Sequence, residues 1–203
     1  MTVEIIDCEQ GSDAWVKARL GIPTASEFAK ILASPQDGET PKTRRTYMYK
    51  LIGEILTGEQ ADGFSNNHME RGRQMEDEAA NWYAFAENVE PIRVGFIRNG
   101  NKGASPDRLI GDNGLLELKT KLPHIQVEVL LTGKLPSSHK AQVQGELWVA
   151  EREWCDFVSY WPKMPPFKLR VYRDETYIAH LAKMVDIFCN ELETVLAAIR
   201  EAA

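Results

Sequence analysis

The stretch from residue 105 to residue 120, with the sequence SPDRLIGDNGLLELKT, constrains the fold of this chain more than any other stretch. Two short apolar pairs, at 109–110 and 115–116, flank the sequence Gly-Asp-Asn-Gly at 111–114. Glycine and asparagine tolerate the positive φ that a tight turn between antiparallel strands requires. The stretch therefore predicts a β-hairpin.

Charged side chains converge on one face of this hairpin. Successive side chains of a strand point to opposite faces, so Glu117 and Lys119 share one face while Leu116 and Leu118 share the other. Asp107, near the outer end of the first strand, can approach Glu117 across the pair of strands. We therefore expect two carboxylates and one lysine to lie close together.

This trio indicates metal-assisted hydrolysis of phosphodiester bonds. Converging carboxylates repel each other unless a cation lies between them, and oxygen ligands favour Mg²⁺ or Mn²⁺ over zinc. A lysine beside the metal can orient or deprotonate a water molecule and offset charge on a phosphate. The pattern resembles the PD-(D/E)xK nuclease signature, which is short and matches many unrelated chains. A surface hairpin with solvated charges explains the trio equally well.

Composition and charge narrow the classes of protein that fit the sequence. A chain of 203 residues, 43% of them hydrophobic, fits one globular α/β domain spanning 1–203. No apolar run is long enough to cross a bilayer, and the N-terminus lacks the features of a signal peptide, so we expect a cytoplasmic protein. The net charge of -6 means that any DNA contact requires local basic patches, on a concave or enclosed surface. Cys8, Cys155 and Cys189 lack metal or redox spacing and are expected to be buried free thiols.

Two neighbouring helices near the N-terminus form a candidate anion site. The first is predicted from residue 14 to residue 20, and the second from about Ala25, after a sequence with capping-box spacing at 24–27. Ser26 in the first turn of the second helix and Arg19 on the first helix could together grip one phosphate. Capping alone explains the capping-box residues equally well.

Two further helices carry charges that need an explanation. A helix from Lys42 to Gly58 begins with basic residues, which oppose the helix dipole and therefore suggest a negative partner, either DNA phosphate or solvent. A helix over 69–88 places Glu76 among apolar and small residues, where a buried carboxylate would need a partner or a metal. An exposed helical glutamate is the alternative for Glu76.

The rest of the chain completes an α/β pattern. Strands are expected over 94–98, 154–161 and 167–172, and helices over 125–131, 137–150 and 176–202. In the helix over 137–150, Gln142 and Glu146 share one face. We expect a mixed central sheet flanked by helices.

Several motifs in order along the chain resemble the phage lambda exonuclease family, also called YqaJ-type viral recombinase nucleases. The matching segments span most of the chain, and they are Asp13-Ala14-Trp15, Arg19-Leu20-Gly21, Thr24-Ala25-Ser26-Glu27, Arg71-Gly72-Arg73-Gln74-Met75-Glu76, Ser105-Pro106-Asp107, Leu116-Glu117-Leu118-Lys119 and Ala141-Gln142-Val143-Gln144. The resemblance implies a restriction-endonuclease-like core. It also implies Mg²⁺-dependent digestion of one strand of linear double-stranded DNA, 5′ to 3′, with release of mononucleotides and a 3′ overhang.

The resemblance further implies a setting and partners. Family members act in phage-type recombination, so we expect a protein of phage or prophage origin in the bacterial cytoplasm. A homotrimeric ring that threads DNA would reconcile the acidic chain with its substrate, because basic side chains could line the channel. A single-strand annealing recombinase is the expected partner.

At the matching positions, the resemblance implies roles in catalysis. Asp107 and Glu117 would bind the metal, with the Leu118 carbonyl as a further ligand. Lys119 would position or activate the attacking water. Glu76 would complete the acidic cluster and assist a second metal.

The resemblance also assigns residues that orient the site and bind DNA. Gln142 would orient active-site groups, and Arg19 and Ser26 would hold the 5′-phosphate. Met69 lies where an apolar residue helps to separate the terminal base pair, and core packing is equally plausible there. The loop around Gln36 is less basic than the family pattern, which leaves its DNA role open.

Two other functions fit parts of the pattern. A site-specific or structure-specific endonuclease on the same core would cut closed circular DNA, whereas the exonuclease would require a 5′-phosphorylated end. A non-catalytic DNA clamp would have no chemical use for the intact trio at 107, 117 and 119.

Overall fold

The computed structural model describes residues 2–33, 41–60 and 67–202, and within 67–74 it describes the backbone alone. Its helices are α1 (Asp13–Arg19), the 3₁₀ helix η1 (Ala25–Glu27), α2 (Phe28–Ile31), α3 (Lys42–Thr57), α4 (Asn67–Glu87), α5 (Pro123–Thr132), α6 (Ser137–Ala150) and α7 (Glu175–Ala202). Its strands are β1 (Val3–Ile6), β2 (Ile92–Arg93), β3 (Phe96–Asn99), β4 (Lys102–Ala104), β5 (Arg108–Ile110), β6 (Gly114–Thr120), β7 (Trp154–Tyr160) and β8 (Phe167–Tyr172).

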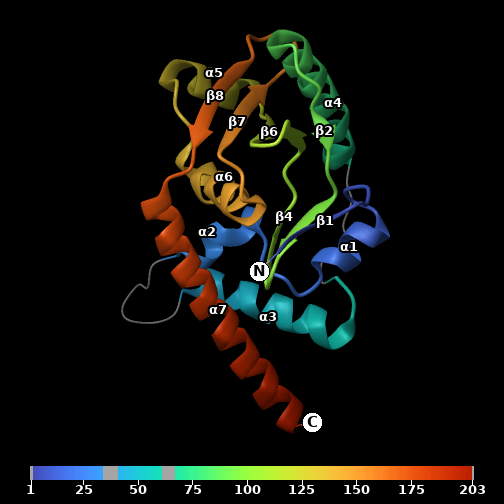
Figure 1. Ribbon diagram of the computed structural model, residues 1–203, viewed down its shortest axis with the longest axis vertical. Coiled ribbons are helices and arrows are strands. Elements are labelled where there is room, and N and C mark those ends of the chain that lie inside the picture. Colours follow the sequence, from blue (N-terminus) through green and yellow to red (C-terminus); the bar gives the residue numbers. More distant parts are fainter. Residues whose placement is uncertain (1, 34–40, 61–66, 203) are drawn as a thin grey trace.

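The strands form two sheets (Figure 1). The larger sheet has the order β2-β5-β6-β7-β8 and is mixed, because β6 and β7 run parallel while the other pairs are antiparallel. This confirms the predicted mixed α/β architecture. The second sheet, β1-β3-β4, was not predicted as a separate sheet.

The strand predicted over 94–98 is confirmed from Phe96, where β3 begins, whereas Val94 and Gly95 lie between β2 and β3, where the chain passes from one sheet to the other. β2 pairs with β5 and β3 pairs with β1 and β4, with Gly95 between them. A Cβ at Gly95 would lie 2.3 Å from the Cys8 carbonyl oxygen and 2.7 Å from that of Ile6. The crossing therefore depends on a residue without a side chain.

The predicted hairpin is confirmed. Ile110 pairs with Gly114 and Arg108 pairs with Leu116, and Gly111 has a φ of 52° in the turn. Beyond Leu116, β6 continues along β7, and no strand among the described residues pairs with its other edge, since β5 begins at Arg108. This free edge of β6 is where Asp107 enters the site.

The two faces of the larger sheet have different roles. On one face, α4 packs through Ala79 and Tyr83 against Leu116, Leu118 and neighbouring apolar residues. The opposite face belongs to the main core, which includes Leu115, Phe157 and residues of α6, α3 and α7. Since side chains alternate along β6, Glu117 and Lys119 face the side of α6.

Two expectations about helix starts need correction. At residue 25 the chain forms a 3₁₀ turn before α2, and Thr24 makes no capping hydrogen bond because its hydroxyl contacts Arg19 and Ser26 instead. In α3, the negative partner of Arg44 is Glu191 of α7, with an Nη1–Oε2 distance of 2.6 Å. Arg44 is only 5% exposed, so it is a structural residue rather than a DNA contact.

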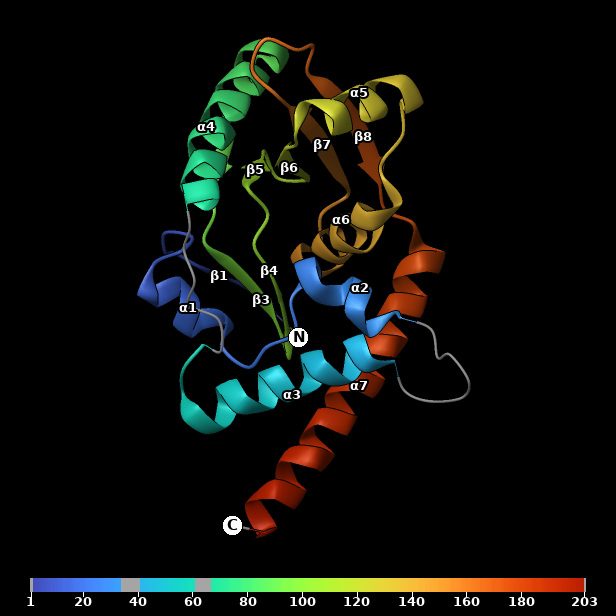
Figure 2. The same ribbon diagram turned by 180° about the vertical axis from the view of Figure 1, so that it is seen from behind.

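Figures 1 and 2 show where the C-terminal helix lies. The C-terminal part of α7 extends beyond the rest of the molecule, at the end opposite to α4 and α5.

None of the helices in the described ranges is both long and apolar enough to span a membrane. Cys155 and Cys189 are buried free thiols as expected, whereas the free thiol Cys8 is only half-buried. The loop around Gln36 lies outside the described residues.

Candidate active site

The hairpin brings together the three residues that the sequence singled out. Asp107 lies directly before β5, and its Oδ2 accepts a hydrogen bond of 2.6 Å from the Leu118 backbone N–H. Lys119 forms an ion pair with Glu117 Oε1. Glu117 is 1% exposed, so this pair is held inside the molecule.

Burial and mutual repulsion make this cluster electrostatically unfavourable without a counter-charge. Burial raises the pKa of Asp107 well above its usual range, and the negative charge of Glu117 raises it further. Burial alone would lower the pKa of Lys119, but the charges of Glu117 and Asp107 outweigh it and raise that pKa. Lys119 is therefore an ammonium at neutral pH, which donates hydrogen bonds.

Helix α6 adds two residues to the same cluster. Gln142 Nε2 donates to Glu117 Oε1 at 2.6 Å and to Glu146 Oε1 at 2.9 Å. Glu146 is 1% exposed, and burial and the charge of Glu117 raise its pKa. The spacing of four residues between Gln142 and Glu146 predicts that both share one face of the helix, but nothing in the sequence shows that Glu146 is buried beside Glu117.

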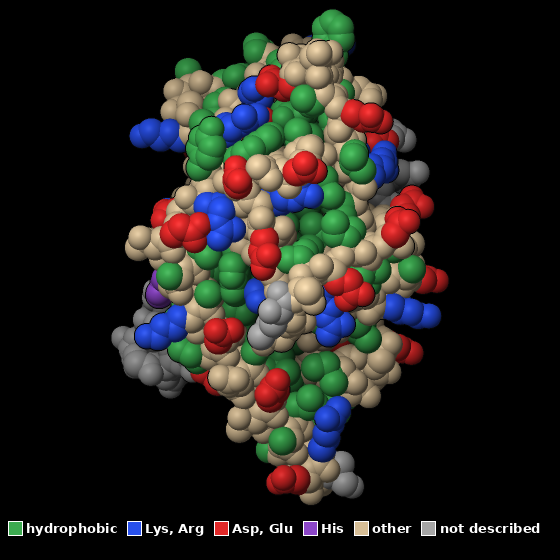
Figure 3. Space-filling view, in the orientation of Figure 1, with side chains coloured by type: hydrophobic (Ala, Val, Ile, Leu, Met, Phe, Trp, Pro, Cys, Tyr) green, Lys and Arg blue, Asp and Glu red, His purple; other side chains and the backbone are tan. Residues whose placement is uncertain are grey.

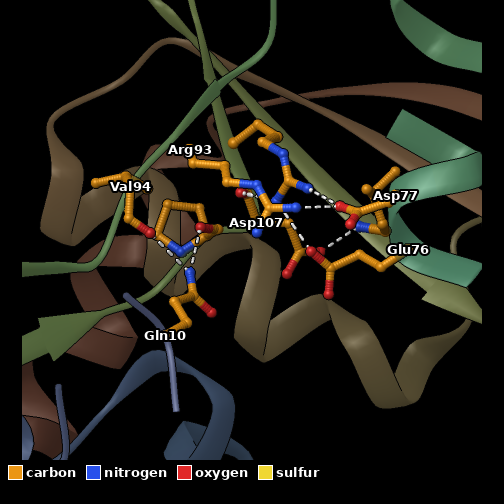
Figure 4. A network of polar contacts seen from close by, with 9 residues as sticks. Gln10, Glu76, Asp77, Arg93, Val94 and Asp107 are labelled. Carbon is orange, nitrogen blue, oxygen red and sulfur yellow. Dashed lines mark hydrogen bonds and ion pairs between the residues drawn. The ribbon is translucent and has the colours of Figure 1, made fainter. Parts of the chain in front are cut away.

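Glu76 lies on α4 at the other side of Asp107, in a network of ion pairs (Figure 4). Arg108 Nη1 donates to Glu76 Oε1 at 2.9 Å and Arg108 Nη2 donates to Asp77 Oδ1 at 3.0 Å. Arg93 also pairs with Asp77. Half-buried Glu76 thus has Arg108 as its protein partner, and it borders a cavity of about 520 Å³ that Asp107 also lines.

Gln10 fixes the backbone on both sides of this cavity. Its Nε2 donates to the Val94 carbonyl at 2.9 Å and to the Pro106 carbonyl at 3.0 Å, as Figure 4 shows. Because Pro106 immediately precedes Asp107, these bonds restrict the backbone that carries the carboxylate. Gln10 was not identified from the sequence, since its contacts lie far along the chain.

The oxygen atoms on the free edge of β6 suit a hard divalent cation. Glu117 Oε2 is buried and has no hydrogen-bond partner in the described part of the chain. The N–H and C=O of one strand residue point to the same side, so the Leu118 carbonyl shares the edge at which Asp107 accepts the Leu118 N–H. Among the described residues, no three His, Cys, Asp or Glu side chains form a metal-binding group. The fitting donors are thus two carboxylates and one carbonyl, and Mg²⁺ accepts such a set when water completes its shell.

Arg19 and Ser26 lie beside this cluster. The Arg19 guanidinium stacks on the Trp15 ring at 4.1 Å and donates to Thr24 Oγ1 at 3.3 Å, and Thr24 Oγ1 lies 3.3 Å from Ser26 Oγ. Trp15 is anchored in turn by a 2.9 Å hydrogen bond to Ser105 Oγ. A cavity of about 170 Å³ is lined by Arg19, Thr24 and Ser26 on one side and by Gln142 and Glu146 on the other.

The structure therefore brings most of the candidate residues into one region. Lys119 and Gln142 both bond Glu117 directly. Asp107 joins them through the N–H of Leu118, the residue between Glu117 and Lys119. Arg19 and Ser26 share a cavity with Gln142, and Glu76 shares another with Asp107. The Met69 side chain lies outside the described residues.

Comparison with known proteins places this site in a family. A family model described as the YqaJ-like viral recombinase domain matches residues 14–153. Two crystal structures of LHK-Exo, one titled as an alkaline exonuclease from Laribacter hongkongensis and one in complex with dAMP, are 33% and 34% identical to this chain. Each alignment covers 94% of this chain and 97% of that chain, with TM-scores of 0.85 and 0.86.

A more distant structure shares the fold alone. It is a phage-related exonuclease from Haemophilus somnus 129PT, which is 13% identical with a TM-score of 0.67 and coverage of 88% of this chain and 96% of that chain. No curated protein sequence gave a significant match. Because the family model spans more than half of the sequence and LHK-Exo aligns along nearly all of it, the chain belongs to the YqaJ-like viral recombinase family.

Proposed function

We propose that this member of the YqaJ-like viral recombinase family is a Mg²⁺-dependent exonuclease of linear double-stranded DNA. It would digest one strand 5′ to 3′, release mononucleotides and leave a 3′ overhang for phage-type recombination. Family and neighbours support a phage-type nuclease, a hydrolase that acts on DNA. The observation that carries the finer proposal is the cavity that Arg19 and Ser26 line together with Gln142, which is bonded to Glu117.

The proposed chemistry assigns a task to each residue of the cluster. Asp107, Glu117 and the Leu118 carbonyl would hold Mg²⁺, for which Mn²⁺ is a possible substitute. When bound, the ion supplies Lewis-acid polarisation of the phosphate and lowers the pKa of a coordinated water. Lys119, as an ammonium, would orient the attacking water and offset charge on the phosphate. Glu76 would assist a second cation from the neighbouring cavity.

Recognition of a terminal phosphate would set the direction and the size of the product. Arg19 offers a fixed guanidinium and Ser26 an exposed hydroxyl, which suit the oxygens of a phosphate monoester. A 5′-phosphate held there would place a nearby phosphodiester bond at the cluster, so each cleavage would release one nucleotide. The similar LHK-Exo was crystallised with dAMP, which belongs to this class of product.

The charge of the molecule supports a ring-shaped assembly. On the face in Figure 3, Lys and Arg side chains are interspersed with Asp and Glu, and the net charge of the chain is -6. A homotrimer could gather the basic side chains of three copies around one DNA duplex. Sedimentation of the protein in solution should then give three times the mass of the chain. A single-strand annealing recombinase would be the partner that takes up the exposed 3′ strand.

The proposal is tested with three DNA substrates in Mg²⁺. We expect steady release of mononucleotides from linear duplex with 5′-phosphorylated ends, slower release from 5′-hydroxyl ends and no cutting of a closed circle. Cutting of the circle would instead make the protein an endonuclease. No cutting of any substrate, together with retained DNA binding, would make it a clamp.

A further inference from the structure

Glu146 is a buried acidic residue whose presence needs an explanation. It lies on α6, is 1% exposed, and its Oε2 has no hydrogen-bond partner among the residues that the structure describes. A buried carboxylate costs stability unless other interactions compensate for its lost hydration. An apolar side chain would pack at this position without that cost.

Within the described part of the chain, Gln142 alone donates a hydrogen bond to Glu146. The Gln142 amide group has two hydrogens on Nε2, and they serve Glu117 Oε1 at 2.6 Å and Glu146 Oε1 at 2.9 Å. Gln142 directs its nitrogen rather than its oxygen at both acids, an arrangement that suits carboxylate oxygens that accept hydrogen bonds. Two acceptors on one side of the amide therefore determine the orientation of Gln142.

This orientation has a consequence for Glu117. Glu117 Oε1 receives hydrogen bonds from Gln142 and Lys119, whereas Glu117 Oε2 receives none. The carboxylate is thus held by one oxygen, and its other oxygen is left available for a cation. If Gln142 turned over, its amide oxygen would face Glu117 Oε1 and repel it.

We propose that Glu146 is a positioning residue, which holds Gln142 so that Gln142 and Lys119 together orient Glu117 for metal binding. Glu146 acts through Gln142, whose amide group donates to it. The inference rests on the proposed function, since it concerns the same site. Outer partners of metal ligands typically contribute about 10-fold to 100-fold to metal affinity or activity.

Two substitutions separate this role from simple packing. Glu146→Leu removes the acceptor and leaves Gln142 free to turn, so kcat should fall by about 10-fold to 100-fold while KM for DNA changes little. Glu146→Gln can still present an oxygen to Gln142 Nε2, so it should recover most of the lost kcat. In a Gln142→Leu background, Glu146→Leu should add little further loss, because the residue through which it acts is already gone.

Gln144 provides the matched control on the same helix. It is 2% exposed, and its side chain bonds the Tyr172 carbonyl and the Asp174 N–H, away from the cluster. Gln144→Leu removes two buried hydrogen bonds and should lower the melting temperature, but kcat should remain that of the wild type. A loss of kcat in Gln144→Leu as large as that in Glu146→Leu would overturn the positioning role.

A second readout needs no DNA. The rise in melting temperature on addition of Mg²⁺ reports binding of the ion to the folded protein. This rise should shrink in Glu146→Leu and persist in Gln144→Leu and Glu146→Gln. An unchanged rise in Glu146→Leu, or a Glu146→Gln variant as impaired as Glu146→Leu, would overturn the inference. If the wild type lacked Mg²⁺-dependent hydrolysis, the proposed function itself would fail, which is a separate outcome.

Discussion

The Asp107 carboxylate accepts a backbone N–H of β6 that β5 does not reach, and the same carboxylate belongs to the candidate active site. The N–H of Leu118 lies beyond the last pair of the hairpin, where β5 no longer covers β6. The Asp107 carboxylate accepts that N–H and so stabilises the free edge, while its charge remains available for a cation. The same interaction determines the separation of the two candidate metal ligands.

Removing the charge of Asp107 should abolish hydrolysis without unfolding the site. Asp107→Asn keeps an oxygen that can accept the Leu118 N–H, yet the lost metal interaction, several kcal/mol, should reduce kcat by at least about 1000-fold. Binding of DNA, measured by gel shift, should persist. Asp112→Asn in the exposed hairpin turn is the control and should leave hydrolysis unchanged. Undiminished Mg²⁺-dependent cleavage by Asp107→Asn would refute the site assignment.

Arg19 should decide which DNA ends are preferred. Its guanidinium borders the cavity that leads to Gln142, so Arg19→Ala should reduce the preference for 5′-phosphorylated over 5′-hydroxyl ends by about tenfold or more, as expected for a charge-assisted bond. The measurement is the ratio of initial digestion rates on the two ends. Lys17→Ala removes an exposed charge on the same helix and should keep the ratio. An unchanged ratio in Arg19→Ala would place the phosphate pocket elsewhere.

At the scale of elements, the contact between α6 and η1 sets the geometry of the site. Ser26 lies on η1, and Gln142 and Glu146 lie on α6. The two elements approach closely at Gly145, where an added Cβ would lie 2.5 Å from the Phe28 ring and 3.2 Å from the Ala25 side chain. Phe28 and Ala25 are both fully buried, so their side chains have little room to move away from an added Cβ.

Gly145→Ala should therefore destabilise the protein and disturb both halves of the site. Overpacking of a dense core typically costs about 1–3 kcal/mol, which should lower the melting temperature. Digestion of phosphorylated ends should slow as well, because η1 must move relative to α6. Gly53→Ala in α3 is the control, since nothing lies within 4 Å of its added Cβ, and it should stabilise the helix by about 0.5–1 kcal/mol. Equal melting temperatures for wild type and Gly145→Ala would contradict the close contact.

The sequence predicted those elements whose signals are local. The hairpin at 111–114 carries its turn residues, and α6 carries Gln142 at helical spacing, so both were found with correct boundaries to within a residue or two. Only part of the 94–98 segment forms a strand, because at Val94 and Gly95 the chain passes from β2 to β3, which belong to different sheets. β1 was missed because its partner β3 is distant in the sequence, and β4 was missed because it is only three residues long.

The residues of the candidate site also fall into two groups, those that the local sequence predicts and those whose contacts depend on how distant elements pack. Asp107, Glu117 and Lys119 were found because strand alternation and a tight turn bring them together. The burial of Glu146, the role of Gln10 and the pairing of Arg44 with Glu191 depend on how separate elements pack. Periodicity alone predicts which residues share a face of one element, but it does not show which other element covers that face.

At the scale of the whole molecule, an acidic chain must bind an acidic substrate. Three acidic side chains, those of Asp107, Glu117 and Glu146, lie close to one ammonium, that of Lys119, so their ionised forms repel one another and a phosphate unless a divalent cation is present. The cation therefore both completes the site and permits the substrate to approach it. Activity that depends on Mg²⁺ is the expected result of this charge balance.

The central claim, Mg²⁺-dependent digestion from a 5′-phosphorylated end, is tested most directly by labelling the two ends of one strand separately. In linear duplex DNA with Mg²⁺, a label on the 5′-terminal nucleotide should appear at once as mononucleotide, while a label on the 3′-terminal nucleotide should remain in long DNA until digestion is almost complete. Neither label should be released when EDTA replaces Mg²⁺. Early release of the 3′ label, or equal release in EDTA, would contradict the account.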